Sequence, residues 1–328
     1  MSKEISEKIK IQLNNPAVNA DNGHIPVLLD EVIEGLNIRP NGKYVDCTLG
    51  GAGHASRVIA RLDGGHLYAF DQDEETRIKA IDRLNKISDS FTVFDTNFVN
   101  IKECLNNSNV EKVDGIYYDL GVSSFQFDTP ERGFSYNYDS KLDMRMDTSQ
   151  KLSAYNIVNE YPFEELRRIF YLYGEEKFST QIARNIEKSR KEKPIETTFE
   201  LVEIIKKSLP AKELRKKGHP AKQVFQAIRI AVNNELDVFS KSLEDALEML
   251  NPGGRICVIT FHSLEDRICK QMFKEKTEVN IPRGLPIKEK DIKLEYKLIT
   301  KKPIVATEKE LNENRRSHSA KLRIIEKL

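Results

Sequence analysis

The 328-residue sequence has no tryptophan, only four cysteines and six histidines, and a net charge of only +1. The cysteines are far apart and form no C-x-x-C pair, so neither a disulfide framework nor a zinc site is indicated. We expect them to be buried as small hydrophobic residues. The histidines are not paired at i, i+3 or i+4, and no metal is expected. No apolar run approaches the roughly 20 residues that a membrane helix needs.

The first 22 residues also lack the apolar core of a signal peptide. Charged residues alternate with isoleucine from Lys3 to Lys10, and the remainder is polar. We expect this tail to be disordered or weakly helical, and the protein to be cytoplasmic. The rest of the chain is long enough for one large or two moderate domains with real cores.

The segment 44–54, with the sequence YVDCTLGGAGH, is the most informative part of the chain. Its β-branched and aromatic residues predict a buried strand. Gly50, Gly51 and Gly53 then allow a sharp turn and a close approach of the backbone to a ligand. A helix beginning near Gly53 would direct free N–H groups at that ligand. This arrangement is typical of nucleotide-like ligand sites at the carboxyl end of a parallel sheet.

Two details bear on the identity of the ligand. The dinucleotide fingerprint G-x-G-x-x-G, placed on Gly51 and Gly53, would need a third glycine where the chain has Ser56. This disfavours NAD and favours S-adenosylmethionine. A second apolar strand, 67–71, ends on Asp71, where such folds hold ribose hydroxyls with a carboxylate. Alone, the glycines could form a plain turn and Asp71 a helix cap, but their combination favours a cofactor site.

Alternating patterns predict the organisation of the chain. Strands are expected near 43–48, 66–71, 90–95 and 113–119, with helices near 53–62, 73–87 and 97–107 between them, which implies a parallel sheet. A loop without periodicity follows at 129–150. Further helices are expected at 162–172, 175–191, 198–208, 223–235 and 236–250, and a turn at 251–254 precedes a strand at 255–261. We therefore predict an α/β protein with a Rossmann-like doubly wound sheet and a helical insert, completed by strands after residue 290, one of them antiparallel.

Chemistry in such a sheet lies beyond the carboxyl ends of the strands. Phe98, after the third strand, is a candidate to stack on an adenine ring, a contact worth roughly 1–3 kcal/mol; a core aromatic is an equally good interpretation. Asp119 ends the fourth strand, where a carboxylate would meet the amino group of a cofactor or an incoming amine. His262, Ser263 and Asp266 do not form a hydrolase triad, because no G-x-S-x-G elbow surrounds the serine.

Two regions of the insert have a composition suited to RNA. Between Lys177 and Lys222 there are thirteen Lys/Arg residues and six Glu residues, the pattern of either a phosphate-tracking surface or a solvated helix face. The 129–150 loop contains Arg132 and Arg145 together with aromatic residues. These arginines are candidates to grip an RNA backbone, or else pair with acidic residues of the same loop.

Seven motifs together resemble the bacterial 16S rRNA (cytosine-N4)-methyltransferase family (RsmH/MraW). They are TLGGAGH (48–54), DLGVSS (119–124), ERGFS (131–135), LDMRMD (142–147), YGEE (173–176), FQAIRI-VNNEL (225–236) and FHSLEDR (261–267). The resemblance extends from residue 24 to about residue 323. One departure lies near the carboxyl terminus, where N-P-R-x-R-S is common in the family. Here Arg316 is kept, Arg315 replaces the proline and His318 replaces an arginine, so no role is carried over to His318.

The resemblance implies a class I methyltransferase fold. The S-adenosylmethionine-binding domain would comprise 23–128 and 236–328, and the helical insert 129–235 would recognise the substrate. The activity implied is N4-methylation of one cytidine in the 16S rRNA of the 30S subunit, without a metal or a membrane. The resemblance assigns no catalytic residue. The cofactor contacts that it implies are Ala52, Gly53, His54, Asp71, Phe98, Asp119 and Gln126.

The chemistry of an exocyclic amine sets requirements for such an enzyme. The lone pair of the amine is delocalised into the ring, so nitrogen, methyl and sulfur must be held in line, a positioning effect that supplies roughly 7–11 kcal/mol. Asp119 is a candidate acceptor for an N4 hydrogen, although we assign it first to the cofactor. The base must be unstacked to reach the site, which favours loop RNA. Methylation of adenine N6, an NAD-dependent oxidoreductase and a non-catalytic RNA-binding protein are the alternatives.

Overall fold

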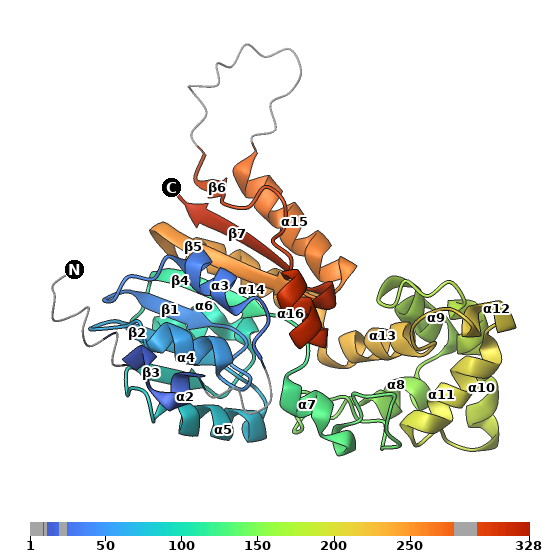
Figure 1. Ribbon diagram of the computed structural model, residues 1–328. Coiled ribbons are helices and arrows are strands. Elements are labelled where there is room, and N and C mark those ends of the chain that lie inside the picture. Colours follow the sequence, from blue (N-terminus) through green and yellow to red (C-terminus); the bar gives the residue numbers. More distant parts are fainter. Residues whose placement is uncertain (1–8, 10–11, 20–24, 279–293) are drawn as a thin grey trace, which may run out of the picture. The chain divides into compact units, whose positions relative to one another are not determined.

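The computed structural model describes residues 9, 12–19, 25–278 and 294–328. These residues divide into two compact units (Figure 1). Unit 1 contains the chain up to Gly121 and again from Asp237, and unit 2 contains Val122–Leu236.

Unit 1 is built on one seven-stranded sheet, whose strand order is β3-β2-β1-β4-β5-β7-β6. The strands are β1 (Lys43–Asp46), β2 (His66–Phe70), β3 (Phe91–Phe94), β4 (Val113–Asp119), β5 (Leu250–Thr260), β6 (Tyr296–Leu298) and β7 (Lys321–Lys327). The first five run parallel, and β7 pairs antiparallel with both β5 and β6. The strand order reverses between β1 and β4, which is the switch point where open α/β sheets bind ligands.

Helices cover both faces of this sheet, as Figure 1 shows. One face packs against α3 (Leu29–Leu36), α4 (Gly53–Ile59) and α5 (Glu74–Leu84), and the other against α6 (Ile101–Asn107), α14 (Glu235–Glu248) and α15 (Ser263–Thr277). Successive strand residues alternate between the two cores: Tyr44 belongs to the first and Val45 to the second. Both faces are buried, so the strands are largely apolar, with exceptions such as Asp46 in β1. The predicted doubly wound α/β fold is confirmed.

One local expectation for unit 1 is wrong, and the helical alternative for the amino-terminal tail is correct in part. The NPGG sequence at 251–254 does not precede the strand but lies within β5, where the pairing with β4 shifts register between Val113 and Gly115. Part of the amino-terminal tail is ordered: α2 (Pro16–Asn19) buries Val18, and the Arg83 guanidinium donates to the carbonyls of Ala17 and Val18. The rest of the tail, apart from residues 9 and 12–15, lies outside the described residues.

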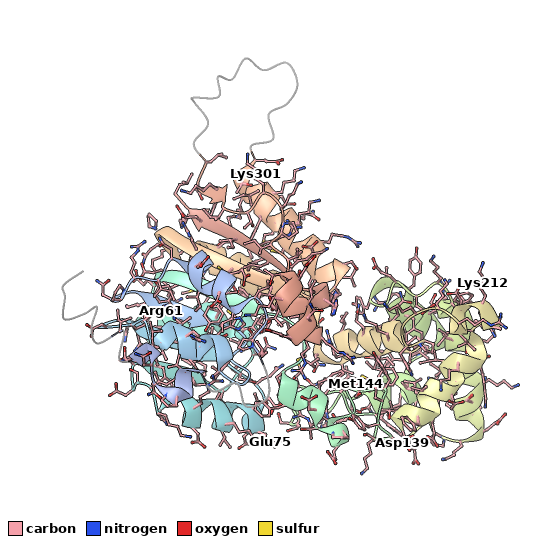
Figure 2. The ribbon with its side chains drawn as sticks, viewed as in Figure 1. Arg61, Glu75, Asp139, Met144, Lys212 and Lys301 are labelled. Atoms are coloured by element: carbon pink, nitrogen blue, oxygen red, sulfur yellow. The ribbon has the colours of Figure 1, made fainter. Side chains whose placement is uncertain are left out.

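Unit 2 is helical. Its helices are α7 (Ser124–Asp128), α8 (Ala154–Glu160), α9 (Phe163–Leu172), α10 (Ser179–Glu192), α11 (Thr198–Ser208), α12 (Ala211–Leu214) and α13 (Lys222–Asn233). Their apolar faces form one core that includes Phe170, Ile186 and Ile228. The 129–150 segment contains only the short 3-10 helix Pro130–Arg132, and this agrees with the predicted loop. Asn233 holds the loop by donating to the carbonyl of Met144, which Figure 2 labels.

Candidate functional site

Asp71 lies at the end of β2 and is oriented by two backbone groups. The Gly50 N–H donates to Oδ2 at 3.0 Å, and the Asp73 N–H donates to Oδ1 at 2.9 Å. Burial, with a smaller effect from the neighbouring carboxylates, raises the pKa of Asp71 to about 7. Each oxygen can accept a second hydrogen bond, so the carboxyl can receive two adjacent hydroxyls while it holds the glycine turn.

The glycine turn has the left-handed backbone that its sequence suggests, and one of its left-handed residues is not a glycine. Gly50 has φ of 48°, and Ala52, which is not a glycine, has φ of 57° immediately before α4 begins. A Cβ on Gly53 would collide with the ring of Pro26. The turn therefore needs its glycines for backbone conformation at Gly50 and for close packing at Gly53.

A buried network behind this turn was missed by the sequence reasoning. Asp46, at the end of β1, is 1% exposed and accepts hydrogen bonds from the Tyr117 hydroxyl at 2.7 Å and the Thr48 N–H at 2.9 Å. The Thr48 hydroxyl oxygen accepts from the Asp119 N–H at 2.7 Å. Burial raises the pKa of Asp46 to about 7. The network joins the ends of β1 and β4, and an aspartate inside an otherwise apolar strand was the available signal.

Asp119 and His54 meet at the end of β4. His54 Nδ1 lies 3.6 Å from Asp119 Oδ2, and His54 Nε2 lies 3.0 Å from the carbonyl oxygen of Val27. Among the described residues, none forms a hydrogen bond with the buried Oδ1 of Asp119. Burial and the nearby carboxylates of Asp46 and Glu265 raise the pKa of Asp119 to about 8. Burial lowers the pKa of His54 to about 4, so its ring is neutral.

Phe98 and Gln126, the two remaining predicted cofactor contacts, belong to separate units. Phe98 is half-buried in the 3-10 helix Phe98–Asn100, with its ring edge-on to Tyr118 at 5.7 Å, a position compatible with both interpretations above. Gln126 belongs to unit 2, where its side-chain oxygen accepts from the Ser123 N–H in a capping box of α7. The cofactor contacts of both residues stay predictions.

The residues of the rejected hydrolase triad have other partners. Asp266 accepts from Arg323 at 2.7 Å and from Lys321 at 3.2 Å, and these contacts lower its pKa against the effect of burial. His262 caps α15 by accepting from the Glu265 N–H. The carboxylate that a triad would need is thus engaged by two cations.

The cysteines were expected to be buried as small hydrophobic residues, and no membrane helix was expected. All four cysteines are free thiols, and three are buried as expected, while Cys104 is half-buried. Burial raises the pKa of Cys257 far above its ordinary value. Within the residues that the structure describes, no helix has the length and apolar character to cross a membrane.

In unit 2 the loop arginines make internal contacts. Arg145 forms a bidentate pair with Asp143, with distances of 2.9 Å and 2.7 Å, and Arg132 donates to the carbonyls of Arg145 and Met146. The alternative of pairing within the loop is therefore confirmed for Arg145, and the RNA contacts of both arginines stay predictions. The guanidinium groups hold an irregular backbone in shape.

The basic stretch of unit 2 contains two kinds of lysine. Lys206 pairs with Glu203 at 2.9 Å, and Lys216 pairs with Glu213 at 2.6 Å. Within the segment 206–217, four other cations are exposed and have no ion-pair partner among the described residues. These four, which we call the unpaired basic set, are Lys207, Lys212, Arg215 and Lys217; Figure 2 labels Lys212 on α12.

A doubly wound sheet with a glycine turn after β1 and an acidic residue after β2 is the architecture of Rossmann-like proteins that bind nucleotide-type ligands. A model of the MraW methylase family matches residues 21–328, and the chain therefore belongs to the MraW methylase family. A curated relative from Exiguobacterium sibiricum is 59% identical over 306 residues, which cover 93% of this chain and 98% of the relative. That protein is named ribosomal RNA small subunit methyltransferase H.

Two solved structures are more distant. A proposed rRNA methylase from Clostridium thermocellum is 11% identical with a TM-score of 0.45, and the match covers 93% of this chain and 99% of that one. A proposed methyltransferase from Streptococcus mutans, in complex with SAH, is 12% identical with a TM-score of 0.43, covering 93% and 100%.

Proposed function

We propose that the protein transfers a methyl group from S-adenosylmethionine to the exocyclic N4 of one cytidine in the 16S rRNA of the small ribosomal subunit. The match to a named small-subunit rRNA methyltransferase over nearly the full length of both chains carries the proposal. The finer statement, cytosine N4, rests on the motifs DLGVSS, ERGFS and LDMRMD.

The residues at the carboxyl end of the sheet fit such a cofactor. Asp71 offers two acceptor oxygens to the ribose hydroxyls, and the left-handed turn at Gly50 and Ala52 would lie along the methionine part. Phe98 would cover the adenine. Asp119 has a buried oxygen without a hydrogen-bond partner among the described residues, and such an atom calls for a donor. A cationic ligand with amino groups supplies both charge and donors.

The contribution of the protein to the reaction is positioning and proton acceptance. When bound, S-adenosylmethionine supplies an electrophilic methyl group on a sulfonium sulfur. The protein must hold the target nitrogen in line with that methyl group. The Asp119 carboxyl, whose side chain is 28% exposed, accepts a hydrogen of the amine where the cofactor leaves it free, and this favours the pyramidal, nucleophilic form of the amine. The methylated nitrogen is cationic and acidic, so no strong base is needed.

Product analysis tests the reaction. Purified 30S subunits that lack the modification would be incubated with the protein and S-adenosylmethionine, and their nucleosides separated by mass spectrometry. We expect one N4-methylcytidine per subunit. N6-methyladenosine instead would show that the target base is wrong, and the absence of any methylated nucleoside with every RNA substrate would contradict the enzymatic proposal.

We further propose that the helical insert, residues 129–235, recognises the folded subunit rather than the base alone. One flipped cytidine offers too few contacts to select a single site, whereas unit 2 presents a large additional surface. Methyl transfer to 30S subunits, protein-free 16S rRNA and a short hairpin with the target would be compared. We expect the subunit to be preferred. Equal efficiency on all three would remove the proposed role of the insert.

The unpaired basic set provides the sharpest test of an RNA surface on unit 2. Changing Lys207, Lys212, Arg215 and Lys217 to glutamine should weaken RNA binding and reduce its dependence on salt. The matched control changes Lys206 and Lys216, whose charges are already partly neutralised by glutamates. We expect a smaller effect per residue in the control, and no change in cofactor affinity in either variant. An unchanged salt slope in the fourfold variant would show that this surface is only solvated.

A further inference from the structure

His54 is held in one tautomer by its surroundings. The ring is 6% exposed, and its Nε2 lies 3.0 Å from the carbonyl oxygen of Val27. A carbonyl oxygen can only accept a hydrogen bond, so Nε2 carries the hydrogen. In the neutral ring the other nitrogen, Nδ1, therefore presents a lone pair.

That lone pair faces the carboxyl group of Asp119. His54 Nδ1 and Asp119 Oδ2 are 3.6 Å apart, too far for a hydrogen bond but close enough for a direct electrostatic interaction, with side-chain exposures of 7% and 28%. With Asp119 ionised and His54 neutral, two electron-rich atoms would oppose each other. One proton on either group removes that repulsion. The buried Oδ1 has no hydrogen-bond partner among the described residues, so it gives an anion no support.

The charged groups around Asp119 come from three elements. Asp46 on β1 and Glu265 on α15 disfavour a further negative charge, and Arg316, in the 3-10 helix Arg315–Ser319, favours one. Burial and the two carboxylates outweigh the single guanidinium, since the pKa of Asp119 rises to about 8. The neutral acid is thus the preferred form of Asp119 when no additional cation is present.

We propose that His54 and Asp119 hold one proton between them in the cofactor-free protein, and that binding of the cationic cofactor releases this proton to solvent and leaves Asp119 as a carboxylate. One proton passes to the buffer, and the new negative charge offsets the positive charge of the sulfonium group. His54 acts through Asp119 and is a positioning residue. The identity of the cation rests on the function proposed above.

The released proton has a consequence for the order of events. A carboxylate accepts a hydrogen bond from an amine more strongly than a neutral acid does. The target amine therefore meets a strong acceptor only after the charged cofactor is in place. S-adenosylhomocysteine, which has the same ribose and adenine but a neutral sulfur, leaves the proton on the pair.

Calorimetric titration of the full chain tests this proton release. Binding of S-adenosylmethionine and of S-adenosylhomocysteine would be measured at about pH 7 in two buffers with different heats of ionisation. Any proton released at Asp71 is common to both ligands and cancels. We expect S-adenosylmethionine to release about 0.5–1 proton more than S-adenosylhomocysteine, and the difference to disappear above about pH 10.

Three variants locate the proton. Asp119→Asn should abolish the difference between the ligands. His54→Gln keeps a donor for the Val27 carbonyl but removes the Nδ1 lone pair, so the difference should fall. Asp82→Asn removes an exposed carboxylate on α5, and it should change nothing. Equal release with both ligands, or a difference that persists in Asp119→Asn, would overturn the proposal while leaving the cofactor assignment intact.

A second measurement does not depend on the cofactor. In the cofactor-free protein, the infrared band of protonated carboxyls should disappear between about pH 6 and pH 10 in the wild type, and Asp119→Asn should lack the component that titrates near pH 8 while keeping those of Asp46 and Asp71. In His54→Gln the Asp119 component should disappear at lower pH, with circular dichroism confirming the fold. If neither ligand binds, the proposed cofactor is wrong and the infrared titration alone decides the proton pair. Absence of an Asp119-dependent band would overturn the pair.

Discussion

Replacing Asp71 with asparagine separates its cofactor role from its structural one. The asparagine oxygen can keep one of the two backbone hydrogen bonds, from Gly50 or from Asp73. Its NH2 group then faces the other N–H, and one acceptor for the ribose is lost. Leaving a buried hydroxyl unpaired costs about 1–3 kcal/mol, which corresponds to a roughly 5- to 150-fold loss of affinity for S-adenosylmethionine.

The stability of the cofactor-free protein should not fall in parallel. The pKa of Asp71 is about 7 in the folded protein, against an ordinary value of 3.8. The folded state thus binds this proton more tightly than the unfolded state, and ionisation at pH 8 costs up to about 4 kcal/mol of stability. Asparagine resembles the neutral acid and avoids that cost. We therefore expect the variant to be as stable as the wild type, or more stable, at pH 8.

Calorimetric titration with S-adenosylmethionine measures the affinity for the cofactor. Urea unfolding at pH 8 without S-adenosylmethionine measures the stability. Asp82→Asn is the matched control, because it also exchanges a carboxylate for an amide but at an exposed position. Asp71→Asn should bind more weakly without unfolding more easily, and the control should do neither. Unchanged affinity in a folded Asp71→Asn protein would refute the ribose assignment.

Three further predictions follow from the same contacts. The cofactor-free protein should lose stability as pH rises from about 5 to 8, because Asp46, Asp71 and Asp119 bind protons more tightly when folded; greater stability at pH 8 in urea unfolding would contradict this. Tyr117→Phe removes the hydroxyl that donates to Asp46 and should cost about 1–3 kcal/mol in the same assay, with a larger effect at pH 8 than at pH 5. Gly53→Ala introduces a Cβ against a proline ring and should cost about 1–3 kcal/mol of stability, whereas a neutral result would show that the turn can relax.

Much of unit 1 could be predicted because its signals are local. A strand buried on both faces is apolar at nearly every position, as in the β2 sequence HLYAF after its first residue, and such strands alternate with helices that begin at recognisable turns. The glycine turn and Asp71 belong to consecutive strands, and the Gly50–Asp71 hydrogen bond shows that their spacing in sequence does bring them together. The helical character of the insert was equally readable from its periodicity.

The contacts that the sequence did not reveal are those between distant positions or those set by backbone shape. Asp46 and Tyr117 are 71 residues apart, and no short pattern connects them. Arg145 was a candidate for an RNA contact. The turn at Met144, which has φ of 60°, allows Asp143 to accept two hydrogen bonds from the guanidinium group of Arg145. The ordered helix α2 depends on Arg83, whose donors reach back some 65 residues along the chain.

The sequence by itself determined the order of strands and helices, the position of the glycine turn, and the residue types available at the carboxyl end of the sheet. Those features depend on local conformational preference and on the burial of apolar faces, and both can be recognised within short segments of the sequence. The tertiary structure alone decided the protonation of Asp46, Asp71, Asp119 and His54. A pKa depends on how far packing excludes water and on which charges it brings near, and these neighbours come from segments that are far apart in the chain.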